Sequence, residues 1–324
     1  MKRFVKKIFI FLSILILLSF LIDLAISSVL RNDHQRFAGE FNVWNDIYTS
    51  KVDCAIAIYG SSRADMDFDP QIIEKKTTES CYNFGMDGHH FWLEYLRHRE
   101  FLKFNKKPQL IIVSLDIFGL EKRKELYNYG QFLPYMLWNK DIYNFTKSYE
   151  GFNKFDYFIP LIRYSGEGKV LKSCVYTILD KNNKKLRFKG HMAMDIPWNS
   201  DLEKAKKIHD SLVFKIEKEP KLLFKKFIKE CQKKNIQLIF MYPPEYIEGQ
   251  RIVANRKVIM DYYVKISKEY NIPLFDFSND QMSFQKKYFY NANHLNKIGA
   301  QLFSEKVADT ILKYNLQNSL TKKL

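Results

Sequence analysis

The stretch Ala55-Ile56-Ala57-Ile58-Tyr59-Gly60-Ser61-Ser62-Arg63 joins an apolar run to a glycine and two serines. A short apolar run bounded by turn residues is typical of a buried strand, and a helix is expected to begin at Asp69-Pro70. A serine at the tip of a strand-to-helix turn presents its hydroxyl beside backbone N–H groups that no helical bond uses. The stretch therefore predicts a nucleophile turn whose N–H groups stabilise an oxyanion, although glycine and serine are also ordinary turn residues.

Short apolar runs alternate with helical segments on both sides of this turn. The predicted strands are 55–59, 81–84, 109–115, 237–242 and 272–277. The predicted helices begin at Asp69 and cover 91–104, 221–234, 251–270 and 297–312. This alternation predicts an α/β fold, a three-layer sandwich with a central parallel sheet and helices on both faces.

The alternation breaks between about residues 118 and 216, where Tyr, Phe and Trp are frequent and prolines interrupt the chain. We interpret this segment as an insertion over one end of the sheet. It serves either as a lid or acceptor platform, or as a structural subdomain without a role in the chemistry. The expected organisation is an N-terminal tip and anchor over 1–30, a stem over 31–51, the α/β domain over 52–315 and a polar tail over 316–324.

The first thirty residues have the pattern of a membrane anchor. Four cationic residues precede the apolar run Ile8–Ile22, and after Asp23 the run resumes as Leu24–Leu30. The length suffices to cross a bilayer, and the positive flank predicts a cytoplasmic N-terminus with the main domain outside the cytoplasm. The alternative is a secreted protein whose signal peptide is cleaved near Ala25-Ile26-Ser27.

Composition narrows the other possibilities. The formal net charge is +16, but the lysines are spread along the chain without a zinc-finger spacing or basic heptads, so a solvated basic surface is favoured over nucleic-acid binding. Four cysteines without CxxC spacing argue against a zinc site, and no metal is expected. Cys54 and Cys81 fall on neighbouring predicted strands and either pair or remain buried thiols.

Three features fall at the same predicted edge of the sheet. Ser62 follows the first strand, Gly88 follows the second, and His294 lies in the loop after the last. Ligands bind at the carboxyl ends of parallel strands, and a serine needs a base to remove its proton. His294 can supply that base, and Gly88 permits a close backbone approach that completes an oxyanion hole.

The ordered set of these motifs resembles the SGNH (GDSL-like) hydrolase superfamily. The matching blocks are Gly60-Ser61-Ser62-Arg63, Asn83-Phe84-Gly85-x-x-Gly88 and Asn291-x-x-His294-Leu295-Asn296. The likeness extends to the membrane-anchored branch that includes polysaccharide O-acetylation proteins and the D-alanyl transfer protein of teichoic acid synthesis. The resemblance implies that Ser62 is the nucleophile, that Ser62 and Gly88 form the oxyanion hole, and that His294 is the base. It implies no cofactor.

Two positions depart from the family pattern. The family usually has aspartate where this chain has Asn291, and an asparagine orients an imidazole without stabilising its charge. The family usually has an asparagine donor in the oxyanion hole at the position of Asp116, and an ionised aspartate has no proton to donate. Arg63 and His89 are further candidates, for contact with substrate, with a structural ion pair and helix-start polarity as their alternatives.

Together these observations predict an extracytoplasmic acyl-ester hydrolase or O-acyltransferase that acts on a cell-surface glycan through acyl-Ser62. The resemblance implies a membrane-bound O-acyltransferase as a partner. The alternative is a catalytically weak or inactive SGNH-fold protein that binds glycan or assists an acyltransferase, a reading that Asn291 and Asp116 motivate.

Overall fold

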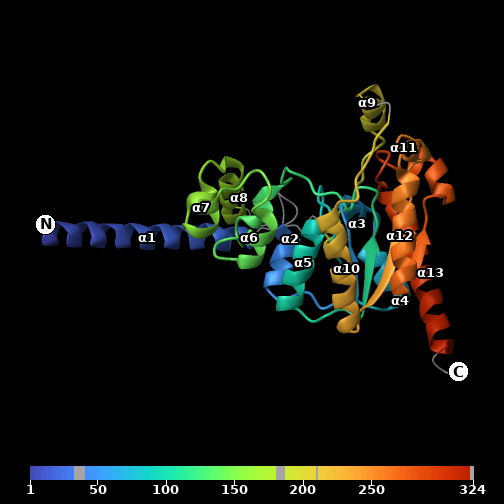
Figure 1. The fold of residues 1–324 in the computed structure, drawn as a ribbon, viewed down its shortest axis with the longest axis horizontal. Helices are drawn as coiled ribbons and strands as arrows, with labels where there is room; N and C mark the ends of the chain where they lie inside the picture. The colour runs from blue at the N-terminus through green and yellow to red at the C-terminus, as the bar shows by residue number, and fades with distance from the viewer. Residues whose placement is uncertain (33–40, 180–186, 209–210, 322–324) are drawn as a thin grey trace. The chain divides into compact units, whose positions relative to one another are not determined.

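The computed structural model describes residues 1–32, 41–179, 187–208 and 211–321, with side chains up to residue 314. The chain divides into two units. The anchor unit is Met1–Asn45 with Arg123–Leu186, and the sheet unit is Asp46–Lys122 with Arg187–Leu324. Figure 1 shows the course of the chain through both.

Five parallel strands form the centre of the sheet unit, in the order β2-β1-β3-β4-β5. Their bounds are β1 (Ile56–Tyr59), β2 (Cys81–Asn83), β3 (Leu110–Ser114), β4 (Gln237–Tyr242) and β5 (Leu274–Asp276). Ile56 pairs with Cys81 on one side and with Leu110 on the other, which fixes the register around the central strand β1. Each strand lies inside its predicted range, and the predicted parallel sheet is confirmed.

Helices cover both faces of the sheet. Ile56 and Ile58 belong to a core shared with Ile73 of α4 (Pro70–Thr77) and Phe303 of α13 (Lys297–Thr321). The next residue, Tyr59, points to the opposite face, where its ring contacts Phe227. That face is covered by α5 (Phe91–Phe104), α10 (Lys218–Lys233) and α12 (Arg256–Tyr270). The predicted three-layer α/β sandwich is therefore correct.

The chain starts its helices where the sequence indicates. Asp69 accepts a hydrogen bond from the N–H of Gln71 and caps α4, whose first residue is Pro70. The predicted helix 251–270 begins later, as α12 from Arg256, and Arg251 is instead the last residue of a separate helix, α11 (Ile247–Arg251). Asn255, directly before α12, bonds through its side chain to both backbone groups of Phe214. The predicted helix 297–312 continues as α13 to Thr321. The sheet unit also contains α9 (Asp201–Ile208) and the 3-10 turns η3 (Gln281–Phe284) and η4 (Lys286–Tyr288).

The anchor unit begins with the long helix α1 (Lys2–Leu30), which is long and apolar enough to cross a membrane. The next described helix is α2 (Phe41–Tyr48), whose Trp44 donates a hydrogen bond to Gln131 and packs on Phe132. Its remaining elements are η1 (Tyr129–Phe132), α6 (Lys140–Thr146), α7 (Lys154–Phe158), η2 (Ile162–Tyr164) and α8 (Gly168–Leu179). Residues 33–40 of the predicted stem and 322–324 of the predicted tail lie outside the described residues.

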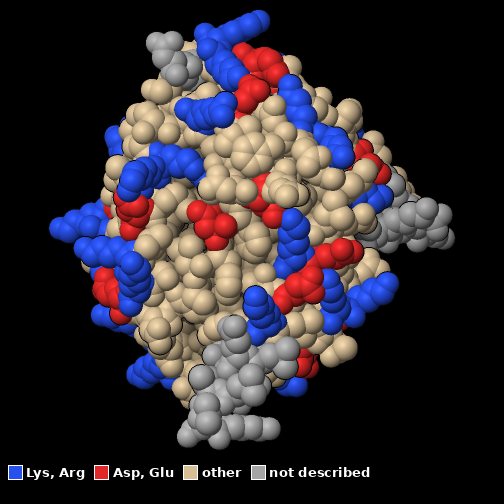
Figure 2. Space-filling view, turned by 90° about the vertical axis from the view of Figure 1, so that its right-hand side faces the viewer, with Lys and Arg blue, Asp and Glu red and all other residues tan. Residues whose placement is uncertain are grey.

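Lys and Arg are interspersed with Asp and Glu on the face of the molecule shown in Figure 2. The surface of the sheet unit carries ion pairs such as Lys225 with Glu269 and Lys206 with Glu248, and pairs this accessible contribute little to stability because solvent screens them. On this face the positive charge is distributed rather than gathered in one patch.

Candidate active site

The turn after β1 is shaped by Gly60. Its φ is +150°, and a Cβ there would lie 2.8 Å from Cβ of Ser114 and 2.9 Å from Cβ of Ala64. Only glycine fits this close approach without a shift of its neighbours. The next residue, Ser61, accepts a hydrogen bond from the N–H of Arg63 and caps α3 (Ser62–Asp67). Ser62 is thus the first residue of a helix, at the carboxyl end of β1.

The structure brings His294 to Ser62. Oγ of Ser62 and Nε2 of His294 are 2.7 Å apart, which is hydrogen-bonding distance. His294 is half-buried, in the loop between η4 and α13, and its ring stacks on Tyr290. Two of the residues that sequence analysis paired are therefore in contact.

Asn291 determines which nitrogen of His294 faces the serine. Its Oδ1 accepts hydrogen bonds from the backbone N–H groups of Asn293 and His294, at 3.0 Å each. Backbone amides can only donate, so the acceptor is the amide oxygen rather than its NH₂ group. Nδ1 of His294 lies 2.9 Å from the same oxygen and must donate to it. Nε2 is then the unprotonated nitrogen, with its lone pair toward Oγ of Ser62, as a general base requires.

The surroundings of His294 favour the neutral imidazole. Burial lowers the pKa of His294 to about 3, and the positive charge of Arg63 acts in the same direction. Asn291 carries no negative charge that would oppose this shift. His294 is therefore a base that remains unprotonated over a wide pH range.

The loop after β2 lies against the nucleophile turn. The N–H of Met86 donates to the carbonyl oxygen of Gly60, and Met86 forms a parallel bridge with Ser61. Gly85 must be glycine here, since a Cβ would lie 2.2 Å from the backbone nitrogen of Asp65. Gly88, two residues after Met86, adopts a φ of +72°. The loop predicted to supply the second oxyanion donor thus runs beside Ser62.

Asn83 connects this loop to α3. Its side-chain amide donates to the carbonyl oxygens of Ala64 and Phe68, and its oxygen accepts from the N–H of Gly85. Asn83 belongs to the motif Asn83-Phe84-Gly85-x-x-Gly88, but the sequence alone indicated no role for its side chain. His89 follows Gly88 and is only 3% exposed, so the structure places it below the protein surface.

Asp116 lies beneath the turn that carries Ser62, with its carboxylate bound to neighbouring side chains. Its Oδ2 accepts a hydrogen bond of 2.5 Å from Oγ of Ser61, and its Oδ1 lies 3.1 Å from Nη1 of Arg63. Tyr263 donates to its backbone oxygen. Both carboxylate oxygens are therefore engaged beneath the turn, and Asp116 supports the residue that precedes the nucleophile.

Arg63 lies in the same buried cluster. It is fully buried, pairs with Glu245 at 3.3 Å as well as with Asp116, and donates to the carbonyl oxygen of Pro243 at 2.6 Å. Its guanidinium also lies over the ring of Tyr242. The structure places Arg63 under the site, in the ion pair that was the alternative to substrate contact.

Asp67 joins the nucleophile helix to the histidine loop, a role that sequence analysis did not anticipate. Its Oδ1 accepts from the N–H of Leu295, the residue after His294, while its Oδ2 has no hydrogen-bond partner among the described residues. Burial raises the pKa of Asp67 well above its ordinary value, against the effect of Arg63. No local pattern in the sequence indicates this contact, because Leu295 lies 228 positions from Asp67.

Residues 187–199 fall within the predicted insertion but belong to the sheet unit. They contact both α3 and the loop that carries His294. Arg187 forms a two-pronged ion pair with Asp65 of α3. Further along, the N–H of Asn199 donates to the carbonyl oxygen of Tyr290, close to His294. We name residues 187–199 the crossing segment. It connects the nucleophile helix to the histidine loop.

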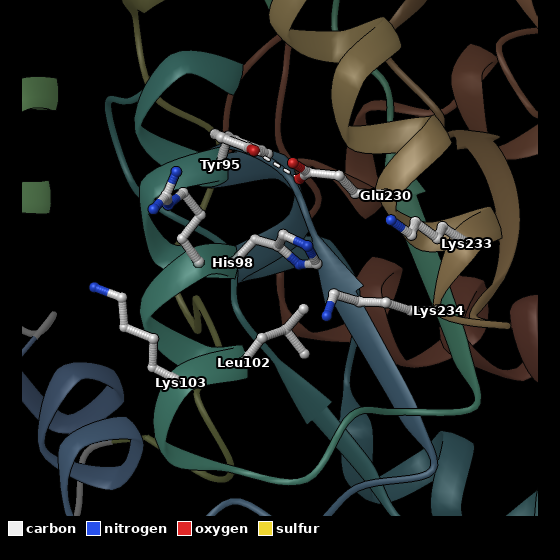
Figure 3. A pocket seen from close by; sticks show the side chains of 8 residues that line it. Tyr95, His98, Leu102, Lys103, Glu230, Lys233 and Lys234 are labelled. Carbon is white, nitrogen blue, oxygen red and sulfur yellow. Dashed lines mark hydrogen bonds between the residues drawn. The ribbon is translucent and has the colours of Figure 1, made fainter.

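A second feature of the sheet unit is a cavity of about 640 Å³ between α5 and α10, whose lining does not include Ser62 or His294 (Figure 3). Lys103, Lys233 and Lys234 stand at its rim, near the last turns of these helices, where cations offset the helix dipole. His98 lies at its floor and is hydrogen-bonded to the hydroxyl of Tyr59, at 3.0 Å between Nδ1 and Oη. Burial and the nearby Lys234 lower the pKa of His98 to about 3.

All four cysteines are separate, buried thiols in the structure, Cys54 and Cys81 included. Burial raises the pKa of Cys54 to about 12. Within the described parts of the chain, no group of three His, Cys, Asp or Glu residues is arranged to hold a metal ion.

The motif positions match the predicted architecture, with serine after β1, glycine after β2 and histidine after β5 of a parallel sheet. No protein-family model and no curated protein matches the sequence. Among solved structures, the chain is similar to a protein assigned to the G-D-S-L lipolytic family from Desulfitobacterium hafniense DCB-2, at 12% identity over 78% of this chain and 97% of that one, with a TM-score of 0.39.

The chain is also similar to the acetyl xylan esterase AlAXEase, at 13% identity over 80% of this chain and 98% of that one, with a TM-score of 0.39. A third structure, assigned as a platelet activating factor from Streptococcus pneumonia, has 12% identity over 84% and 90% of the two chains and a TM-score of 0.39. Similarity at this level carries no information on substrate. The functional conclusions below rest on the geometry of the site.

Proposed function

We propose that the sheet unit is a serine esterase or O-acyltransferase with Ser62 as nucleophile and His294 as base. The single observation that carries this proposal is the 2.7 Å approach of Ser62 Oγ to His294 Nε2, with the proton of the ring held on Nδ1 by Asn291. A hydroxyl facing the lone pair of a neutral imidazole is the arrangement that nucleophilic catalysis requires.

The reaction proceeds in two steps. Oγ of Ser62 attacks the carbonyl carbon of an ester while its proton passes to Nε2 of His294. The tetrahedral intermediate collapses, the C–O bond to the alcohol breaks, and the departing oxygen takes that proton. A second hydroxyl, from a sugar or from water, then attacks the acyl-serine, gives its proton to Nε2, and Ser62 leaves with the proton restored.

Backbone N–H groups would stabilise the oxyanion in both steps. The N–H of Ser62 is in the first turn of α3, where amides have no partner within the helix. The loop that carries Gly88 lies beside it, as the Met86–Gly60 hydrogen bond shows. Asp116 takes no part in this proposal, because its carboxylate is bound to Ser61 and Arg63.

We further propose that the acceptor is a cell-surface glycan, that a membrane-bound O-acyltransferase supplies the acyl group, and that the protein is anchored in the membrane with its N-terminus in the cytoplasm. The cationic residues before α1 support this orientation. The burial of Ser27 supports retention of the anchor. Ser27 lies at the alternative cleavage site, and its hydroxyl contacts that of Tyr164 inside the protein.

Labelling with a fluorophosphonate probe tests the mechanism directly. The full chain in detergent is expected to form one covalent adduct on Ser62, and the Ser62→Ala variant none. Ser62→Ala should also lose hydrolysis of an aryl acetate while its melting temperature stays within a few degrees of the parent. Unchanged turnover in this variant would exclude the mechanism.

An inactive protein that binds glycan or assists an acyltransferase is the second candidate, since Asn291 and Asp116 replace the residues usual in the SGNH family. The fluorophosphonate probe distinguishes this candidate from the enzyme. Absence of an adduct on a folded protein, combined with binding of a polysaccharide, would favour it over the enzyme.

A further inference from the structure

The anchor helix carries an acidic residue that is satisfied from outside the helix. Asp23 is 2% exposed; its Oδ1 lies 2.7 Å from Nη2 of Arg163, and its Oδ2 accepts from the N–H of Leu161 at 2.7 Å. Leu161 adopts a φ of +72°, an unusual conformation for a branched residue. A strained turn and a buried arginine are thus both bound to one carboxylate of α1.

More contacts join the same part of α1 to the rest of the anchor unit. The Ser27 hydroxyl contacts the hydroxyl of Tyr164 at 2.8 Å, and Phe20 stacks on Trp138 with ring centroids 5.6 Å apart. Helix α8 packs along α1, as Figure 1 also shows. The elements between Trp138 and Leu179 therefore hold α1 from about Phe20 onward.

The position of these contacts along α1 gives their depth in a bilayer. A span that begins at Ile8, directly after the cationic residues, needs about 20 residues at about 1.5 Å each to cross roughly 30 Å of hydrocarbon. Such a span ends near Ser27. Phe20 and Asp23 then lie within the leaflet far from the N-terminus, where an acidic residue is tolerated only when it is paired within the protein.

Helix α7 exposes an apolar stripe. Phe155 and Phe158 are 61% and 44% exposed, and their spacing of three residues places them on one face of the helix. Ile159, directly after the helix, is 41% exposed. The buried face holds Asp156 and Tyr157 instead. In water, this distribution leaves aromatic and aliphatic side chains without cover.

Helix α8 has the same arrangement. Val170 and Cys174 are buried, and Sγ of Cys174 lies near the carbonyl oxygen of Ile26 in α1. The neighbouring stripe of Leu171, Val175 and Ile178 is 37%, 54% and 65% exposed, at helical spacing. One face of α8 thus packs on the anchor, and the adjacent face is apolar and open.

We propose that the exposed stripes of α7 and α8 are inserted among lipid acyl chains, in the leaflet where α1 leaves the membrane. The proposal rests on α1 being a membrane anchor. Lipid is the occupant that the geometry favours, because α8 packs on α1 at the depth that the bilayer surrounds. Helix α7 is joined to the same part of α1 through Trp138, which stacks on Phe20 and donates to the carbonyl oxygen of Phe158. Apolar helix faces beside Lys154, Lys169 and Lys172 are the pattern of helices that lie in a membrane interface.

Depth-dependent quenching tests the insertion. Ile178→Cys and Phe155→Cys would each be labelled with bimane in the full chain, in nanodiscs of phosphatidylethanolamine and phosphatidylglycerol that contain no other protein. The native cysteines are buried, and the unsubstituted protein gives the background label. Ser148→Cys, at an exposed polar position of the same unit, is the matched control, and Leu15→Cys reports on α1 itself.

Doxyl-labelled lipid is expected to quench bimane at 178 and 155 several-fold more strongly than at 148, and aqueous iodide should show the opposite order. Iodide access at 178 and 155 equal to that at 148, with Leu15 quenched by lipid, would overturn the insertion alone. That result is expected if the stripes instead dock on the transmembrane helices of another protein. Iodide access at Leu15 would overturn the anchor and the insertion together.

Discussion

Nε2 of His294 lies 2.7 Å from Oγ of Ser62, although 232 positions separate the two residues in the chain. The contact exists because β1 and β5 are parallel strands of one sheet and both residues follow the carboxyl ends of their strands. Asp67 and the crossing segment then bind α3 to the histidine loop. The distance between Ser62 and His294 is thus determined by the sheet and by the contacts that hold α3 against the histidine loop.

Asn291 is expected to maintain activity at a reduced level. Asn291→Asp keeps the three hydrogen bonds to one oxygen and adds a charge beside the developing imidazolium, a gain of about 1–2 kcal/mol or roughly tenfold in kcat/KM. In a serine-protease triad, the reverse substitution of Asp by Asn lowers kcat ~10⁴-fold, because it also puts the imidazole in the wrong tautomer. Here the tautomer is already correct, so the gain should be far smaller. Steady-state kinetics with an aryl acetate measures it.

Asn291→Ala is the matched control for this prediction. Loss of the oxygen frees the imidazole to take either tautomer, so kcat/KM should fall below that of the parent. Equal activity of the Asp and Ala variants would show that Asn291 does not orient His294.

Activity is expected to persist into acid. The pKa of His294 is about 3 in the folded protein against an ordinary value of 6.5, so the base remains unprotonated as pH falls through 6 and 5. The acid limb of kcat/KM should therefore lie well below pH 6. Asn291→Asp should move that limb to higher pH, because the added negative charge raises the pKa of the imidazole.

The same shift affects folding with a definite sign. The folded-state pKa of His294 lies below the unfolded one, so protons bind the unfolded chain first. His294 should reduce the free energy of unfolding as pH falls from about 6.5 toward 3. A His294→Gln variant is expected to lose less stability than the parent over that window; an identical pH dependence of the two melting curves would contradict the shift.

Arg63 is expected to act on stability rather than on substrate binding. Arg63→Met leaves the buried carboxylate of Asp116 without its cation, while Glu245 keeps its ion pair with Arg256, and the loss should cost about 3–5 kcal/mol. Adding Asp116→Asn should recover part of that loss. Chemical denaturation in detergent measures each variant, and a rise in KM at unchanged stability would instead assign Arg63 to the substrate.

Gly190 should be essential for seating the crossing segment. Its φ is +85°, and a Cβ would lie 1.8 Å from the carbonyl oxygen of Asn83. Gly166 has a similar φ of +81° with nothing within 4 Å, so Gly166→Ala isolates the conformational cost of about 1 kcal/mol. Gly190→Ala should destabilise by clearly more and expose residues 187–199 to limited proteolysis; equal effects of the two substitutions would refute the close contact.

Much of the fold was predictable because it depends on local pattern. The apolar runs before Gly60, before Gly85 and at 237–242 are long enough for strands and bounded by turn residues, and their alternation with helical stretches requires a parallel sheet. The positions of Ser62, Gly88 and His294 at one edge follow from that topology. The cap at Asp69 followed from the same local chemistry.

The roles of the supporting residues depended on tertiary contacts. Sequence alone presented Asp116 as a failed oxyanion donor and Arg63 as a candidate for substrate contact, since both follow sheet strands. Only the folded chain shows that Arg63 pairs with both Asp116 and Glu245, the latter 182 residues beyond Arg63 in the sequence. Nothing in local spacing encodes which long side chain is buried against which carboxylate.

The sequence by itself determined that an α/β sheet carries a serine turn and a distant histidine, and that an apolar helix precedes them. Tertiary structure decided the tautomer of His294, because it depends on which atom of Asn291 accepts two backbone hydrogen bonds. It also decided that Asp23 is bound to Arg163, a pairing between α1 and a turn 140 residues away. Such choices depend on geometry within a few ångströms, which periodicity and composition do not specify.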